Sequence, residues 1–205
     1  MGAGGATKLP PAVYLDESPR RRFNLPMPAK KPSRKSAIAK SSPHASTRGP
    51  KSSRPVMPQV YGIPATMKGS LPWDWARDRL TNSHNYLITT MRPDSRPHTM
   101  VMHGIWLENA YYFSTGSTTR KAKNLAVNPN CVVCNENVEE AVIVEGQAWQ
   151  LAVSEIPAAA FGLYQKKYGW KLDPELGPVF KVTPRVVFAM PEKLFPAGAT
   201  RWLFD

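Results

Sequence analysis

The chain has 205 residues, a formal net charge of +12 at neutral pH and two cysteines. Its length allows one good-sized domain or two small ones. No stretch approaches the roughly 20 apolar residues of a membrane span, so a membrane-spanning protein is excluded and a soluble one is expected.

The positive charge is concentrated in the first sixty residues. This segment holds 12 Lys and Arg against Asp16 and Glu17, and it carries ten of the 21 prolines. Its apolar residues are scattered without a period, so it cannot bury enough surface to offset the entropy of ordering. We therefore predict a disordered, basic, Pro- and Ser-rich tail over residues 1–57 and a folded domain over residues 58–205.

The composition of this tail is compatible with several roles. The run SPRRRF at residues 18–23 is similar to a twin-arginine export signal, but no apolar run follows it, so a cytoplasmic location is favoured. An organelle transit peptide is one alternative, and nonspecific binding of nucleic acid or an anionic surface is another. We favour a dispensable extension, or translated sequence upstream of a true start at Met57 or Met67. Because the rest of the chain is nearly neutral, nucleic acid is expected to bind only nonspecifically, through the tail.

After the tail, helical and strand patterns alternate. Ser70 can cap a helix that ends near Ser83, because apolar residues recur there every three to four positions. Ser154 can cap a later helix that ends near residues 167–168. Strands are expected over residues 85–92, 97–107, 111–114, 131–134, 141–153, 178–182, 185–190 and 200–204.

Short turns join several of these strands. Residues 93–96 and the pair Glu108–Asn109 are typical of hairpin turns, and Gly146 is expected to bend or bulge its strand. Six or more strands in hairpins, with helices inserted between them, indicate an α+β fold with a mainly antiparallel sheet. The strand lengths and Gly146 favour closure into a small barrel, since closure removes exposed edges.

The most informative segment is residues 111–129, YYFSTGSTTRKAKNLAVNP. A threonine at 118–119 can cap a helix that has Arg120, Lys121 and Lys123 at its start. Each cation there is disfavoured by about 0.3–1 kcal/mol, because the N-terminus of a helix is already positive. A bound anion would reverse this balance by accepting hydrogen bonds from the cations, hydroxyls and free N–H groups. The segment therefore predicts an anion site, and the alternative is an exposed helix with solvated lysines.

Cys131 and Cys134 form a C-x-x-C pair, a spacing found in redox and metal sites. The pair lies in an apolar run that is typical of a buried strand, in which residues i and i+3 point to opposite faces. We therefore expect ordinary core thiols, with no metal site and no disulfide.

Five segments, in order, resemble the pyridoxamine 5′-phosphate oxidase-like flavin and deazaflavin oxidoreductases, which have the FMN-binding split β-barrel fold. They are NYLITTMRPDSRPHTM, GIWLENAYYFSTG, TRKAKNLAVNPNCVV, VEGQA and VFAMPEKLFPAGATRWLFD. The resemblance covers residues 58–205 and leaves the tail uncovered. It implies a homodimer that binds FMN, or the deazaflavin coenzyme F420, in a groove between the subunits.

The resemblance also implies which residues contact the cofactor. The strand R-P-H-x-M would run along the flavin ring, the segment S-T-G-x-x-x-R-K would bind the phosphate, and the terminal T-R-W-x-F strand would approach as well. The residues expected on this basis are Thr99, Met100, Val101, Met102, Ser114, Thr115, Arg120, Lys121, Lys123, Arg201 and Trp202.

Some of these residues also have a simpler interpretation. Met100 and Met102 have the spacing of core side chains, and Trp202 is typical of a core or dimer-interface aromatic. His98 and His103 are five positions apart, so they have opposite strand parity and cannot both face one ligand. We assign no catalytic side chain on the basis of the sequence.

The function expected from this pattern is an FMN-dependent oxidoreductase acting on a small organic substrate. In such a protein the cofactor ring carries the hydride or electron transfer, and the protein supplies binding and orientation. An F420-dependent reductase is the close alternative, because both cofactors have a tricyclic ring and a phosphate. A noncatalytic flavin or haem binder is the third possibility, and histidine ligation would favour haem.

Overall fold

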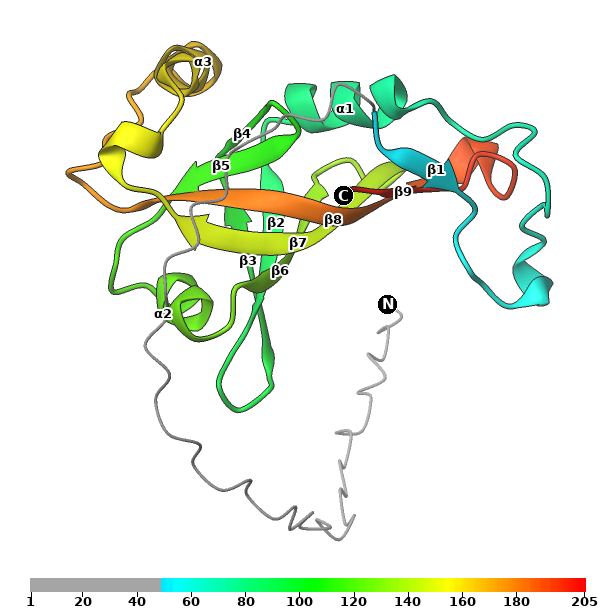
Figure 1. Cartoon of the computed structure of the whole chain (residues 1–205), viewed down its shortest axis with the longest axis horizontal. Coiled ribbons are helices and arrows are strands. Elements are labelled where there is room, and N and C mark those ends of the chain that lie inside the picture. The colour runs from blue at the N-terminus through cyan, green and yellow to red at the C-terminus, as the bar shows by residue number, and fades with distance from the viewer. Residues whose placement is uncertain (1–48) are drawn as a thin grey trace, which may run out of the picture. The chain divides into compact units, whose positions relative to one another are not determined.

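The computed structural model describes residues 49–205, and Figure 1 shows how their helices and strands are arranged. Predictions for residues 1–48, which hold most of the basic tail, lie outside the described residues. The strands are β1 (Lys51–Ser53), β2 (Tyr86–Met91), β3 (Pro97–Met102), β4 (Ile105–Leu107), β5 (Ala110–Ser114), β6 (Asn130–Asn135), β7 (Glu140–Gln150), β8 (Val179–Pro191) and β9 (Thr200–Leu203). The α-helices are α1 (Trp73–Asn82), α2 (Arg120–Val127) and α3 (Ala158–Tyr168), and short 3-10 helices cover Gln59–Tyr61, Val153–Glu155 and Glu192–Leu194.

All nine strands belong to one antiparallel sheet. Hydrogen bonding runs in the order β1-β9-β8-β7-β6-β2-β3, while β5 pairs with β8 and β4 pairs with β5. In Figure 1 the long strands β7 and β8 run side by side, and the three α-helices lie around the sheet. The predicted α+β fold with a mainly antiparallel sheet is therefore confirmed.

Strand β8 divides the sheet into two branches. Along one edge it pairs first with β5, over residues 179–182, and then with β9, over residues 186–189. Pro184 has no N–H to donate, and it lies between these two regions, opposite Gly146 and next to Arg185, the extra residue that shifts the register in β8. The two strands predicted over residues 178–182 and 185–190 are thus one strand of 13 residues. The predicted closure is not made by strand pairing among residues 49–205, because β1, β3 and β4 each have one paired neighbour.

The hairpin turn predicted at Glu108–Asn109 is confirmed, and an irregularity lies at Gly146 as predicted, although the extra residue is Arg185 of the partner strand β8. The register between β7 and β8 shifts at Glu145/Gly146, and a Cβ added to Gly146 would overlap the carbonyl oxygen of Thr183. Glu108 and Asn109 have φ values of 50° and 57°, which is the backbone that a two-residue hairpin turn requires. The turn follows from its local residue types, whereas the irregularity at Gly146 also depends on the contact with β8.

Helices α1 and α3 begin later than predicted. Each begins directly after a proline, Pro72 or Pro157, and not after the predicted caps Ser70 and Ser154. A residue that precedes a proline disfavours the helical backbone conformation. Neither helix therefore begins on the N-terminal side of its proline. Helix α2 has the predicted Thr119 cap, whose side chain accepts a hydrogen bond from the first turn at 3.4 Å. None of the helices within residues 49–205 is both long and apolar enough to cross a membrane.

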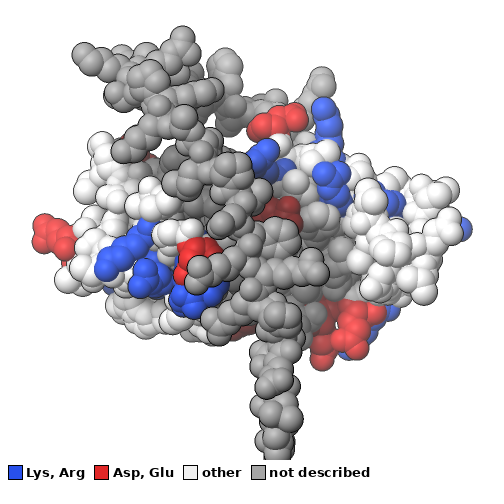
Figure 2. Space-filling model, turned by 90° about the horizontal axis from the view of Figure 1, so that it is seen from below, with Lys and Arg blue, Asp and Glu red and all other residues white. Residues whose placement is uncertain are grey.

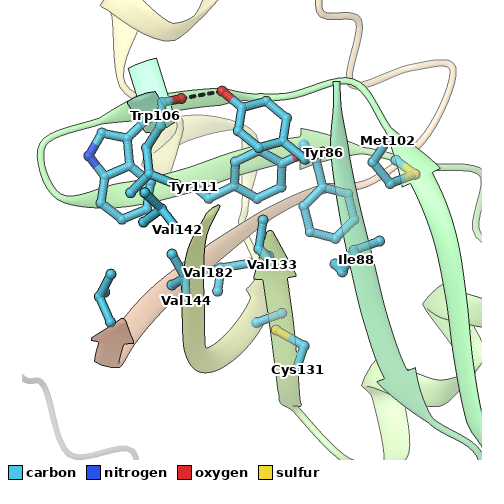
Figure 3. Close-up of a cluster of buried hydrophobic side chains, with 14 of the residues drawn as sticks. Tyr86, Ile88, Met102, Trp106, Tyr111, Cys131, Val133, Val142, Val144 and Val182 are labelled. Atoms are coloured by element: carbon cyan, nitrogen blue, oxygen red, sulfur yellow. Dashed lines mark hydrogen bonds between the residues drawn. The ribbon is translucent and has the colours of Figure 1, made fainter. Parts of the chain in front are cut away.

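The β4–β5 hairpin is buried on both faces. Trp106 and Tyr111 face the main core, where the ring of Tyr111 lies 4.6 Å from that of Tyr86 (Figure 3). Ile105 and Tyr112 face the opposite way and pack with α3 in a second, smaller core. This double burial explains why the segment is almost uniformly apolar instead of alternating.

The strand predicted over residues 97–107 is interrupted. Strand β3 ends at Met102, β4 begins at Ile105, and Gly104 lies in the turn between them. A Cβ at Gly104 would overlap the ring of Tyr111, so a larger residue would force that buried ring to move. Because of this interruption, β3 pairs with β2 while the following strand β4 pairs with β5.

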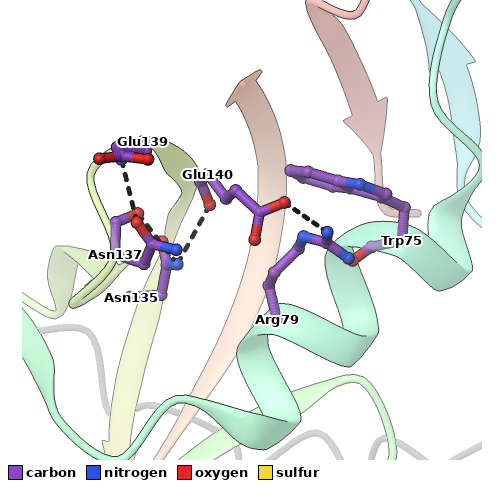
Figure 4. Close-up of polar contacts among 6 residues, drawn as sticks. All are labelled: Trp75, Arg79, Asn135, Asn137, Glu139 and Glu140. Atoms are coloured by element: carbon purple, nitrogen blue, oxygen red, sulfur yellow. Dashed lines mark hydrogen bonds and ion pairs between the residues drawn. The ribbon is translucent and has the colours of Figure 1, made fainter. Parts of the chain in front are cut away.

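A partly buried ion pair holds α1 against β7. Arg79 Nη2 lies 2.6 Å from Glu140 Oε1, and Arg79 Cζ lies 3.8 Å from the ring centre of Trp75 (Figure 4). Asn135 Nδ2 donates to the Glu140 carbonyl at 3.1 Å, which fixes the start of β7. Helix α1 therefore covers one side of the main core.

Residues 51–53, predicted to belong to the tail, form strand β1 and pair with β9, so the folded part begins before residue 58. The short β1 is not apparent from its sequence, because its stability comes from a partner strand about 150 residues away. The next residue, Arg54, donates from its guanidinium to four backbone carbonyls at 2.6–2.9 Å, those of Thr66, Lys68, Ala197 and Ala199.

Replacing Arg54 by methionine is expected to lower the free energy of unfolding by about 2–3 kcal/mol, because four carbonyls lose one charged donor. Urea unfolding measures this change. Lys68→Met is the matched control, since it removes the same charge from an exposed side chain. A loss for Arg54→Met no larger than that of the control would show that the hydrogen bonds of Arg54 contribute nothing to the stability of the folded domain.

Candidate functional site

The N-terminus of α2 is built from threonines and cations. Thr115, just after β5, and Thr119, the N-cap, have their Oγ1 atoms 3.2 Å apart. No acidic residue lies in the first turn of this helix. The free N–H groups, two hydroxyls and the cations Arg120 and Lys121 therefore share one end of the helix.

Lys121 is the most informative of these side chains. It is 9% exposed, yet among residues 49–205 no ion pair or side-chain hydrogen bond includes it. Burial lowers its pKa, because desolvation disfavours the charged form. The stem of Lys121 is buried while its ammonium has no acceptor among the described residues, so an anion at this place would gain a charge-assisted hydrogen bond.

Two further basic side chains lie near this end of α2, in the β2–β3 hairpin. Partial burial, together with the charges of Arg92, Lys121 and Arg120, lowers the pKa of His98. Nδ1 of His98 and Nε of Arg92 are shielded from solvent, and neither has a hydrogen-bond partner within residues 49–205. We call Arg92, His98, Arg120 and Lys121 the basic cluster. Figure 2 shows basic side chains gathered on the face of the molecule that carries α2.

A buried amide fixes α2 in this orientation. Asn124 is fully buried, and its Nδ2 donates to Oγ1 of Thr90 in β2 at 2.9 Å. Thr90 lies directly opposite His98 in the register of β2 and β3. The bond therefore keeps the start of the helix close to His98.

Sequence reasoning missed Arg92, His98 and Asn124. Their proximity to the helix start depends on the β2–β3 register and on the packing of α2 against β2, which are both non-local. One signal was present in the sequence. Asn124 lies between Ala122 and Leu125 on the apolar side of the helix, and a buried polar residue requires a partner.

The four residues predicted to line the ring divide between the two faces of β3. Val101 is 61% exposed, and Thr99 shares its face, with Oγ1 2.8 Å from Oγ1 of Thr89. Met102 is buried in the main core, and Met100 has the same parity. A ligand that lies along β3 can therefore meet the side chains of only one of these pairs.

Ser114 and Lys123 differ in how they relate to the basic cluster. Ser114 Oγ, next to Thr115, donates to the carbonyl of Gly177 at 3.2 Å. Lys123 is two positions from Lys121, which places it on the opposite side of α2, where it lines a separate depression together with Trp149. The structure thus brings Arg120 and Lys121 together with His98 and separates Lys123 from them.

The two C-terminal candidates lie in β9, away from α2 (Figure 1). Trp202 is 1% exposed and packs edge-on against Trp73, with ring centroids 5.4 Å apart, so it is a core aromatic. Arg201 is half-buried and lies opposite Phe188 of β8. Within one chain neither residue meets the basic cluster, and a role for Arg201 at that cluster would require a second copy.

The two histidines and the two cysteines lie on opposite faces or at opposite ends of their strands, as their spacing predicts. His98 belongs to the basic cluster, whereas His103 lies beyond the other end of β3 and packs against Tyr168 at 4.7 Å. The two cysteines lie on opposite faces of β6, as predicted, with Cys131 buried in the main core and Cys134 half-buried.

Burial raises the pKa of the Cys131 thiol to about 12, so this thiol is protonated at neutral pH. Residues 49–205 contain no group of three or more His, Cys, Asp or Glu placed to hold a metal ion.

Two solved structures share the fold. The conserved hypothetical protein Rv2991 of Mycobacterium tuberculosis is 18% identical, with a TM-score of 0.52 over 60% of this chain and 87% of that one. The protein Atu2129 of Agrobacterium tumefaciens is also 18% identical, with a TM-score of 0.50 over 57% of this chain and 55% of that one. At such identities the likeness concerns the fold alone.

Comparison with protein families is more specific. No curated protein matches the sequence. Residues 74–190, which are more than half of the chain, match the family model of pyridoxamine 5′-phosphate oxidase. The matched segment contains β2, β3 and α2, and therefore the whole basic cluster. The chain belongs to the pyridoxamine 5′-phosphate oxidase family.

Proposed function

We propose that the chain binds FMN and acts as a flavin-dependent oxidoreductase on a small organic molecule. The observation that carries this proposal is Lys121, a lysine with a buried stem and an ammonium that is unpaired within the described residues, at a helix N-terminus that has no acidic residue. The unpaired nitrogens of Arg92 and His98 support it, since they lie in the same basic cluster. The family is named for an oxidase, which supports redox chemistry.

The residues at the start of α2 fit a phosphate group. Arg120 and Lys121 would supply charge-assisted hydrogen bonds, one hydroxyl of the hydrogen-bonded pair Thr115 and Thr119 would donate, and the first N–H groups of the helix would complete the set. Ser114 donates its hydroxyl proton to the carbonyl of Gly177, so it would hold the end of β5 in place and not donate to the phosphate. All these donors precede or begin one helix, so one anion can use them together.

Strand β3 would lie along the cofactor ring, with Thr99 and Val101 on its exposed face. The bound flavin would supply hydride or electron transfer. The chain's own residues would bind and orient the ring and exclude water from one side of it. Because the cofactor would carry the chemical step, the site needs no pair of side chains arranged as acid and base.

We also propose that a second copy of the chain covers the exposed face of β2 and β3. Leu87 and Val101 lie directly opposite each other there, and 38% and 61% of their surfaces are exposed. Two adjacent apolar side chains in contact with water favour burial against a partner. Light scattering of the purified protein is expected to show a dimer that Val101→Lys weakens. A monomer at all concentrations would contradict this arrangement.

The cofactor is tested by adding FMN or F420, in turn, to the purified full chain and recording the visible spectrum after gel filtration. We expect flavin absorbance to stay with the protein, and turnover with a reduced nicotinamide to follow. Retention of F420 without retention of FMN would identify a deazaflavin reductase instead. A Soret band in the protein as purified would favour a haem binder, and affinity for none of these groups would refute the proposal.

A further inference from the structure

Tyr168, at the end of α3, forms hydrogen bonds with the backbone of the turn that follows β3. Its Oη accepts a hydrogen bond from the N–H of Gly104 at 2.9 Å. The same Oη lies 2.7 Å from the Gly104 carbonyl and 2.8 Å from that of His84, so its single proton goes to one of them. One side chain of α3 therefore binds both polar groups of the Gly104 backbone.

Lys167 reinforces this contact from the adjacent position. Its Nζ donates to the Gly104 carbonyl at 3.3 Å, to Tyr86 Oη at 2.8 Å and to the Thr81 carbonyl at 3.2 Å. A protonated amine has three N–H groups, and three acceptors surround it. Because the hydroxyl of Tyr86 donates to the carbonyl of Leu80, it is free to accept from Lys167.

These two side chains bind the backbone just beyond the end of β3, and β3 is an edge strand. Within residues 49–205 it pairs only with β2, so the sheet fixes it along one side. Its last residue is Met102, and two residues later Gly104 begins the change of direction into β4. The position of the end of β3 therefore depends on α3 as well as on β2.

We propose that Lys167 and Tyr168 are positioning residues of the cofactor site, which fix the end of β3 by holding the backbone of Gly104. This inference rests on the proposed function, in which β3 lies along the flavin ring. Both residues act at the end of β3 that is remote from the basic cluster. They should therefore influence the ring of the cofactor and leave its phosphate unaffected.

The charge of Lys167 gives a further test. Burial lowers its pKa to about 8, while Glu136 acts in the opposite direction, and burial raises the pKa values of Tyr86 and Tyr168. Between pH 8 and about 10.5 the unfolded chain therefore binds one more proton at this residue than the folded chain. The contribution of Lys167 to stability is present above this window and is lost as the pH falls through 8. We expect the free energy of unfolding of wild type, relative to Lys167→Met, to be larger at pH 9 than at pH 7. Equal differences in urea unfolding at the two pH values would contradict the partly buried placement of the amine.

The positioning role is tested with Tyr168→Phe and Lys167→Met, and Lys166→Met serves as the matched control because that neighbouring lysine is exposed. Hydrogen exchange of the Gly104 amide is measured without cofactor. The dissociation constants of FMN and riboflavin are measured at a temperature where all variants are folded. We expect Tyr168→Phe to accelerate the exchange and to weaken both ligands by the same factor, roughly five- to tenfold, since a buried hydrogen bond is lost. Lys167→Met is expected to weaken both ligands as well, and the control to change neither quantity.

Every other result would overturn either the positioning role or the proposed function. Faster exchange with unchanged affinities would show that the contact is structural only, and unchanged exchange would show that Tyr168 does not hold Gly104. A loss confined to FMN would place the effect at the phosphate and overturn the inference. Failure of wild type to bind either ligand would instead refute the proposed function, on which the inference rests.

Discussion

Combining Arg120→Ala with Lys121→Met is expected to weaken FMN binding about 100-fold, since two charged hydrogen-bond donors to a phosphate are together worth about 3 kcal/mol. The same double variant should not lower the free energy of unfolding of the cofactor-free protein by more than about 0.5 kcal/mol. Methionine keeps the buried stem of Lys121, and both changes relieve repulsion within the basic cluster. Fluorescence titration with FMN and urea unfolding measure the two quantities.

Lys123→Met is the control for this experiment. It removes the same charge from the same helix, but from the side that faces the depression beside Trp149. We expect it to change FMN affinity less than threefold, the effect of a distant, screened charge. If Lys123→Met weakened binding as much as the double variant, the attraction would come from the general charge of α2 and not from a built site.

Gly146→Ala is expected to destabilise the protein by about 2–3 kcal/mol, the cost of forcing extra atoms into a packed interior. The added Cβ would overlap the carbonyl oxygen of Thr183, which belongs to the backbone of β8 and cannot rotate away. Relief would require β7 and β8 to separate at the bulge, next to the point where β8 changes from β5 to β9.

Gly162→Ala provides the comparison for this prediction. Gly162 lies in α3, and apart from its chain neighbours and the backbone of its own helix no atom lies within 4 Å of the position that a Cβ would take. Alanine there should stabilise the helix by about 0.5–1 kcal/mol, because glycine has the higher conformational entropy in the unfolded chain. Chemical unfolding of the two variants should therefore give changes of opposite sign. A loss below 0.5 kcal/mol for Gly146→Ala would mean that the bulge tolerates a side chain, contrary to the packing described above.

The parts of the fold that could be predicted from the sequence are those that depend on neighbouring residues. Thr119 caps α2 because a threonine precedes a helical run, and Glu108–Asn109 turns because a short polar pair separates two apolar strands. The late starts of α1 and α3 were also local, since Pro72 and Pro157 are visible in the sequence. They were missed because the capping serines were weighed more heavily than the restriction before proline.

The parts that could not be predicted depend on partners distant in the chain. Strand β1 exists only because β9 pairs with it, and β8 continues through Pro184 because its neighbours change there. The same holds for the candidate site. Lys121 was predicted from its place at the start of a helix, whereas His98 joins it through the register of β2 and β3. Lys123 was grouped with Lys121 by closeness in sequence, although two residues along a helix place side chains on opposite sides.

The central claim is that the start of α2 holds the phosphate of the cofactor. Comparing the affinities of FMN and riboflavin tests it most directly, because the two ligands differ only in that phosphate. We expect wild type to bind FMN about 100-fold more tightly than riboflavin, and we expect most of this preference to be lost in the Arg120→Ala, Lys121→Met variant. Equal affinities of wild type for the two ligands would contradict the claim.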